Sequence, residues 1–156
     1  MIFSAQITTP INTTELQPLR TDLKCASGLI YQLDVVFPPG SSGLMGVQIR
    51  NQNVSLYPRN REGWFIGDNY TLSFPDLFEL FVDSNIIEIY TYNTDTDYEH
   101  LVSVSIGIVA RDDYIEHFLP GRTVKGLIES LENMTAIFSN ASLPVDKSWI
   151  DRILGK

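Results

Sequence analysis

The sequence predicts a mainly β chain that forms an antiparallel β-sandwich, for which the jelly roll is one possible topology. An extended N-terminal arm and a short helical C-terminal tail are expected to flank the sandwich. Apolar and polar residues alternate in several short segments between residues 29 and 109, and turn residues separate these segments every ~8–12 residues. A change of hydrophobic period after Ala110 predicts the tail. The expected organisation is an arm over residues 1–20, a sandwich over residues 21–110 and a helical appendage over residues 111–156.

The plainest strand patterns begin at Leu29 and at Val102. Alternate residues of the first segment are apolar, which predicts a half-buried strand with Gln32 and Asp34 on its other face. A cluster of proline, glycine and serine at residues 38–43 ends it. The second segment alternates valine or isoleucine with serine or glycine, and it is the cleanest β pattern in the chain. The apolar positions of the two segments are Leu29, Tyr31, Leu33, Val35 and Phe37, and Val102, Val104, Ile106 and Ile108.

Three further segments predict strands. Around residues 47–50, Val47 and Ile49 are expected to point inward and Gln48 and Arg50 outward. Residues 70–74 are expected to form a strand that Pro75 closes, because proline has no amide hydrogen to donate. Residues 86–92 carry apolar side chains on both faces, which predicts a strand covered on both sides.

Residues 2–7 are compatible with a short strand, but Pro10 and Pro18 interrupt any regular element over the first twenty residues and predict an arm. Such a segment either ends a sheet edge or reaches toward a neighbour. Ile2 and Phe3 belong to a set of apolar residues too sparse to form a core of their own. We therefore expect them to pack on neighbouring subunits.

The tail is predicted to contain a helix that follows Thr123 as its N-cap. Its apolar residues are spaced by three and four positions, so they form one stripe, which is expected to pack on its own domain or on a sister subunit. Pro144 suits the first turn of a second short helix, whose Trp149 is expected to contact a neighbouring subunit. The stripe consists of Val124, Leu127, Leu131, Met134 and Phe138.

The charge distribution excludes several classes of partner. The chain of 156 residues has a net charge of −8, and up to Ala110 it holds 5 basic and 12 acidic residues. Such a surface repels phosphate groups, which argues against nucleic acid and against anionic membranes as partners. Cys25 is the only cysteine, so it cannot form an intrachain disulfide, and it is predicted to be a small buried apolar residue.

The motifs that carry enzymatic chemistry are missing, so the protein is predicted not to be an enzyme. His100 and His117 are the only histidines and form no zinc motif, and no serine-nucleophile motif occurs. The sequence does not exclude a carboxylate pair for glycoside hydrolysis, because the distance between such carboxylates in space is not given by their separation in sequence. Oxygen side chains at alternate positions from Asn93 to Glu99 resemble a calcium loop but lack its glycine and glutamate. We therefore expect these residues to form a solvated hairpin tip that binds no metal. We also expect the protein to have no cofactor.

The loop at residues 57–65 is the segment that most suggests binding. It groups aromatic and arginine side chains, the types enriched in interface hot spots, although aromatic residues beside a strand also fill cores. The candidate contact residues are Tyr57, Arg59, Arg61, Trp64 and Phe65.

Motifs spread over roughly residues 21–109 resemble a family of small virion-associated structural proteins of tailed phages and related viruses. They are turn and packing residues, and the helical tail departs from the short family pattern. The motifs are Val36-Phe37-Pro38-Pro39-Gly40, Gly43-Leu44-Met45-Gly46-Val47-Gln48-Ile49, Tyr57-Pro58, Gly63-Trp64-Phe65, Gly67-Asp68, Phe74-Pro75 and Tyr98-Glu99-His100.

The resemblance implies a structural component of a viral particle, either a capsid-decoration (cement) protein or a small tail or connector subunit. It implies copies of the chain itself and major capsid or connector proteins as partners. The protein would reside in the virion after synthesis in the host cytoplasm. The alternative is a carbohydrate- or protein-binding sandwich module without catalysis, in which Trp64 and Tyr57 form a stacking platform.

Overall fold

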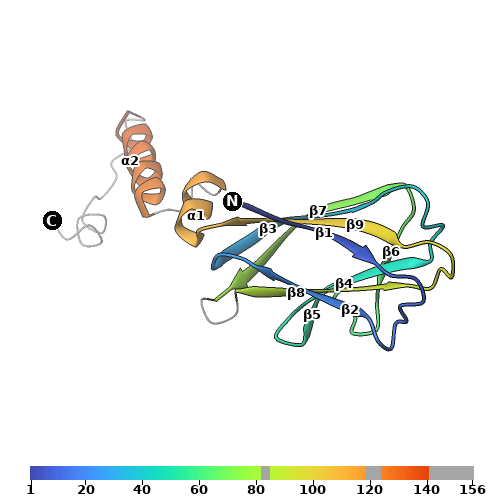
Figure 1. Ribbon diagram of the computed structural model, residues 1–156. Coiled ribbons are helices and arrows are strands. Elements are labelled where there is room, and N and C mark those ends of the chain that lie inside the picture. The colour runs from blue at the N-terminus through green and yellow to red at the C-terminus, as the bar shows by residue number, and fades with distance from the viewer. Residues whose placement is uncertain (82–84, 119–123, 141–156) are drawn as a thin grey trace. The chain divides into compact units, whose positions relative to one another are not determined.

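The computed structural model describes residues 1–81, 85–118 and 124–140. It divides the chain into two compact units, Met1–Arg111 and Asp112–Lys156, so the second boundary agrees with the sequence. The first unit is a sandwich of two antiparallel sheets (Figure 1). Its strands are β1 (Ile2–Thr9), β2 (Leu19–Lys24), β3 (Gly28–Phe37), β4 (Met45–Asn51), β5 (Val54–Tyr57), β6 (Phe65–Ile66), β7 (Tyr70–Leu80), β8 (Ile86–Asn93) and β9 (His100–Val109).

The strand order is that of a jelly roll. One sheet has the order β1-β9-β3-β7 and the other β2-β8-β4-β5, with β6 also paired to β4. The first strands pair with the last in a nested series, β1 with β9, β2 with β8, β3 with β7 and β4 with β5 and β6. The chain therefore pairs as one long hairpin rolled into two layers, which is how jelly rolls are built.

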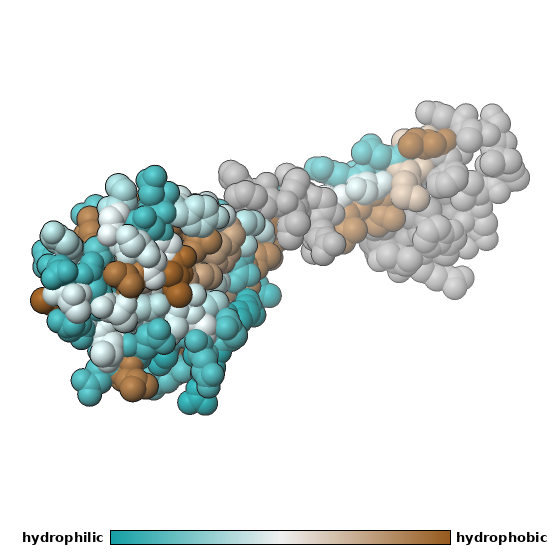
Figure 2. All heavy atoms as spheres, turned by 90° about the vertical axis from the view of Figure 1, so that its right-hand side faces the viewer, coloured by the Kyte–Doolittle hydropathy of each residue, from teal (hydrophilic) through white to brown (hydrophobic). Residues whose placement is uncertain are grey.

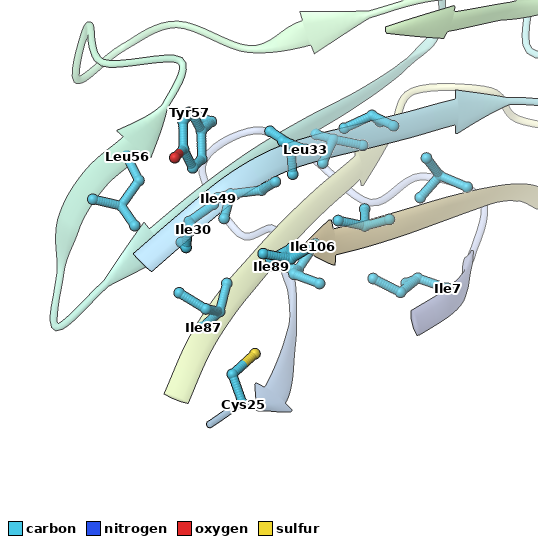
Figure 3. Close-up of a cluster of buried hydrophobic side chains, with 14 of the residues drawn as sticks. Ile7, Cys25, Ile30, Leu33, Ile49, Leu56, Tyr57, Ile87, Ile89 and Ile106 are labelled. Atoms are coloured by element: carbon cyan, nitrogen blue, oxygen red, sulfur yellow. The ribbon is translucent and has the colours of Figure 1, made fainter. Parts of the chain in front are cut away.

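The core lies between the two sheets and is formed by the alternate residues that the sequence identified. Val102, Val104, Ile106 and Ile108 of β9 are fully buried. Leu33 and Ile106 of one sheet face Ile49 and Ile89 of the other (Figure 3). Cys25 lies at the margin of this core, and burial raises the pKa of its thiol to about 11.

A β-bulge changes the face of β3 near its start. Leu33, Val35 and Phe37 point into the core as predicted, but Ile30 is buried there in place of Leu29 and Tyr31. The register of β3 shifts between Ile30 and Gln32 against both neighbouring strands. One extra residue in a strand reverses the alternation of faces, so the period of two fails there.

Two other expectations about strands are corrected. β7 continues through Pro75 to Leu80, because β7 is an edge strand and an edge position tolerates the missing amide donor. Gln48 does lie on the outer face of β4, but it is fully buried, because the loop at residues 58–64 covers it. The strand β8 is covered on both faces along most of its length, as predicted.

The N-terminal residues are part of the sandwich, which corrects the prediction of a separate arm. All eight residues of β1 are in register with β9, from Ile2 opposite Gly107 to Thr9 opposite His100. Ile7 is buried among the core residues, and Phe3 packs against them. The two prolines lie in the connection from β1 to β2 and interrupt neither strand.

The second unit contains α2 (Val124–Asn140), and α1 (Arg111–Phe118) begins at the boundary. The helix α2 confirms the periodicity of three and four residues. The helix α1 was not predicted from hydrophobic spacing, but Asp112 and Asp113 in its first turn suit the positive end of a helix dipole. Thr123, Pro144 and Trp149 lie outside the described residues, so the predicted cap and second helix stay predictions.

Candidate functional site

The loop at residues 57–65 is held against the outer face of the sheet that contains β4. The side-chain amide of Gln48 donates hydrogen bonds to the backbone oxygens of Arg61 and Gly63, at 3.0 and 2.7 Å. Arg50 in turn donates from Nε to Gln48 Oε1 at 2.6 Å. A buried amide with both ends bonded fixes the loop, so the side chains of the loop are presented in a defined arrangement.

The start of this loop lines an open pocket of about 260 Å³. Its apolar part is a set of aromatic rings in edge-to-face contact, with Tyr57 and Phe65 each packed on Phe74 at centroid distances of 5.7 and 5.8 Å. The remaining lining comes from Leu56, Pro58, Arg59, Pro75 and Asp76. The pocket lies beside the edge strand β7, and it brings together three of the five residues predicted in the loop, Tyr57, Arg59 and Phe65.

Polar groups gather at one side of the pocket. Arg59 Nη2 lies 3.2 Å from Asp76 Oδ2, and the Arg59 side chain is largely exposed. The hydroxyl of Tyr57 is buried and makes no hydrogen bond to any described residue, although the Asp76 carboxylate is near enough to affect its pKa. Burial, reinforced by Asp76, raises the pKa of Tyr57 above its ordinary value. The pocket thus combines an apolar floor with a charged pair, features that suit a ligand with a ring and polar groups.

Trp64 lies at a different place from this pocket. Its ring packs edge-to-face on Tyr92 at 4.9 Å, and Tyr92 lies over Gly46, where a Cβ atom would approach the Tyr92 ring to 2.2 Å. Tyr57 packs on Phe74 instead. The structure therefore does not unite Trp64 and Tyr57 in one stacking platform, because they belong to separate aromatic groups.

The outer face around Trp64 carries a charged network that the sequence analysis did not identify. Arg20 lies 3.2 Å from the nearly buried carboxylate of Glu88, which also accepts a hydrogen bond from the Tyr90 hydroxyl at 3.2 Å. The Arg50 guanidinium lies over the Tyr90 ring, 4.6 Å from its centroid. These residues come from β2, β4 and β8, so only the sheet order reveals that they are neighbours.

The other predicted contact residues are spread over the molecule. Ile2 is 74% exposed on β1, whereas Phe3 is half-buried against the core. Arg61 is exposed and holds the loop through its backbone oxygen. Trp149 lies outside the described residues.

The acidic tip between β8 and β9 is organised by its own side chains. Asn93 is fully buried and donates to the backbone oxygens of Thr9 and Tyr98, at 3.2 and 2.9 Å. Asp95 accepts hydrogen bonds from the Asp97 amide at 2.8 Å and from His100 Nε2 at 3.0 Å. Hydrogen bonding by the Asp97 amide, opposed by desolvation and aided by His100, lowers the pKa of Asp95. Thr94 and residues 96–99 are exposed, so the tip is solvated as predicted except at the buried Asn93.

Removing divalent cations is expected to leave the protein's melting temperature unchanged to within about 1–2 °C. The Asn93 and Asp95 oxygens already accept hydrogen bonds from the chain, and the described residues contain no cluster of three potential metal ligands. Calorimetry with and without a chelator measures the effect. Calcium at a hundred times its dissociation constant would add about 2.7 kcal/mol to the free energy of unfolding. A melting temperature that falls by several degrees on chelation would therefore contradict this expectation.

No family model and no curated protein matches the chain. Among the described residues there is no helix with the length and apolarity needed to span a bilayer.

Proposed function

We propose that this protein is a structural component of a viral particle that acts by protein–protein binding in multiple copies, without catalysis. A capsid-decoration (cement) protein or a small tail or connector subunit is the role that fits, with copies of itself and major capsid or connector proteins as partners. The observation that carries the proposal is the exposed apolar stripe of α2, because such a stripe requires another helix or surface to cover it.

The stripe of α2 has the spacing of a helix that associates with others like it. Leu127, Leu131 and Met134 are 53%, 44% and 51% exposed, and they follow one another at intervals of four and three residues. Hydrophobic side chains of the described helical residues are visible at the surface (Figure 2). The flanking positions Ile128 and Ile137 are also apolar and exposed, so the apolar face of the described part of α2 is wide. An isolated helix of 17 residues is marginally stable in water, and burial of this face would stabilise it.

The fold and the charge of the sandwich support the viral role by analogy. Jelly rolls recur in viral capsid proteins, although the same fold also serves lectins and cupins. The excess of acidic residues up to Ala110 suits a particle exterior, where like charges keep particles apart. The resemblance of the turn motifs to virion-associated proteins points the same way.

We expect Leu131→Glu to lower the mass of the assembly, while Asn133→Glu leaves it unchanged. Both substitutions add one carboxylate to an exposed position of the same helix, but only residue 131 lies in the stripe. Burial of an unpaired carboxylate in a helix interface is strongly unfavourable. Light scattering coupled to size-exclusion chromatography of the full chain measures the mass. Equal masses for the two variants and the unsubstituted protein would overturn the role given to α2.

A second candidate function is a carbohydrate- or protein-binding module, which the pocket beside β7 favours. Its aromatic floor and the Arg59–Asp76 pair suit a sugar ring with polar substituents. A glycan array, repeated with Arg59→Ala, separates the two candidates. Binding that is lost on removal of this exposed arginine supports the module, and an empty array contradicts its carbohydrate-binding form.

A further inference from the structure

The sandwich has four sheet edges, and three of them carry features that prevent pairing with other strands. The edge strand β2 carries charged residues, including Arg20 and Asp22, which are each nearly half exposed. The edge strand β7 contains Pro75 and an irregular register against β3. The fourth edge consists of the short strands β5 and β6. Charges, proline, bulges and short length are the usual protections of an open edge.

The strand β1 has none of these protections along the eight residues that the structure describes. Its sequence, IFSAQITT, has no charged side chain and no proline, and its register with β9 is unbroken. Among the edges of the described sandwich it is therefore the one suited to accept another strand.

The direction of the free backbone groups follows from the pairing with β9. Met1 and Ile108 exchange backbone hydrogen bonds, at 2.6 and 2.7 Å. Hydrogen-bonded pairs alternate in an antiparallel ladder, so Phe3, Ala5, Ile7 and Thr9 bond to β9. The alternate residues Ile2, Ser4, Gln6 and Thr8 consequently direct their amide and carbonyl groups toward the open edge. Their side chains are exposed on the outer face of the sheet.

We propose that β1 pairs antiparallel with β1 of a second copy of this chain, which joins the two sheets across a twofold axis. This inference deepens the proposed function, on which it rests, by naming the surface that joins copies. Pairing about Ala5 places Ile2 of each copy opposite Thr8 of the other, and Ser4 opposite Gln6. The pairs bring an apolar residue against threonine and serine against glutamine, so no like charges meet.

The open side of the sandwich next to β1 supports a second copy as the occupant. Phe3 and Ala5 point toward the core but are only half-buried, because no strand lies beyond β1 to cover them. Ile2 is exposed on the outer face of the same strand. A neighbouring β1 would cover these residues on both faces with a strand that is as uncharged as their own.

The test uses Gln6→Pro, with Gln6→Ala as its matched control. The amide of Gln6 points away from β9, so proline at this position removes no hydrogen bond within the domain but blocks the open edge. Alanine removes the same side chain and keeps the amide. Each substitution is made in the full chain, alone and together with Leu131→Glu, and masses are measured over a range of concentrations.

We expect the Leu131→Glu chain to dimerise through β1. Adding Gln6→Pro should weaken that dimer at least about tenfold, and adding Gln6→Ala should change it less than about twofold. Residue-resolved hydrogen exchange should show amides 2, 4, 6 and 8 protected in the dimer and exchanging freely in the monomer.

Each alternative outcome is distinct. A mass that responds to Leu131→Glu but never to Gln6→Pro overturns pairing at β1 and leaves the proposed function in place. A mass that responds to Gln6→Pro alone supports pairing and overturns the role of α2. Protection of the four amides without a dimer means that the chain itself covers the edge, which also overturns the inference.

Discussion

Deleting residues 1–19 is expected to unfold the sandwich. The deletion removes β1, the partner of β9 along its whole length, together with the buried side chains of Ile7 and Thr9. It also uncovers Val102 and Val104, which are fully buried in the intact fold. Domains of this size are stable by only about 5–15 kcal/mol, so we expect the loss of one strand of four together with two buried side chains to leave no folded state.

Point variants separate the contribution of β1 from the severity of a deletion. Ile7→Ala is expected to lower the free energy of unfolding by about 2–5 kcal/mol, because it leaves a cavity in the core. Gln6→Ala, next to it but exposed, should change the free energy by less than about 0.5 kcal/mol. Urea denaturation followed by circular dichroism gives both values. A cooperative transition in the 1–19 deletion like that of the full chain would show that β1 is dispensable.

Asn93→Ala is expected to lower the free energy of unfolding by about 3 kcal/mol. The substitution removes two hydrogen bonds from the Asn93 amide and one to its oxygen from the Asp95 amide, all at a fully buried position. Each buried group left without a partner costs about 1–3 kcal/mol, and relaxation of the tip recovers part of that.

Asp97→Ala serves as the control for Asn93→Ala in the same tip. The side chain of Asp97 is exposed, and its contribution to the tip is through its backbone amide, which the substitution keeps. We expect a change of less than about 0.5 kcal/mol. Similar losses in the two variants would mean that charge in the tip, and not the buried amide of Asn93, stabilises the connection between β8 and β9.

Strands whose two faces differ clearly were predicted correctly from the sequence. β9 alternates branched apolar residues with serine and glycine, and its apolar residues line the core. β3 follows the same rule only beyond Gln32, because the bulge at Tyr31 depends on pairing with two other strands and leaves no mark in hydrophobic spacing. The alternation of apolar and polar residues within a strand indicates which face is buried, but it does not indicate where the register with neighbouring strands shifts.

The pairing of the N-terminal strand with β9 was not predicted, because the pattern of β1 is weak within its own segment. Ala5 is small and Ile2 is apolar but exposed, so apolar and polar residues do not alternate strictly in β1. Its partner β9 begins at His100, so the pairing that stabilises β1 lies far away in sequence. The helix α2 was easier to predict, because the spacing that defines a helix is contained within the segment.

The candidate site was predicted in part. Three of the aromatic and arginine residues singled out at positions 57–65 line one pocket, and their role in binding stays a prediction. The separation of Tyr57 from Trp64 depends on their partners Phe74 and Tyr92, which come from different sheets. Asp76 and the buried Glu88 network likewise depend on sheet order, for which a single sequence gives no direct signal.

The nested pairing of the strands also determines when the chain can fold during its synthesis. β9 pairs with both β1 and β3, so the sheet that contains them cannot form before residues 100–109 leave the ribosome. At translation rates of about 5–20 residues per second, the interval between the synthesis of β1 and that of β9 is on the order of 5–20 s. During that interval the uncharged edge of β1 and the apolar face of β3 are unpaired, so they can associate with other nascent chains. Folding then has to close contacts between the two ends of the domain, which is slow for such distant pairs. A chaperone that shields the first strands until β9 emerges would therefore raise the yield of folded protein more than one acting after release.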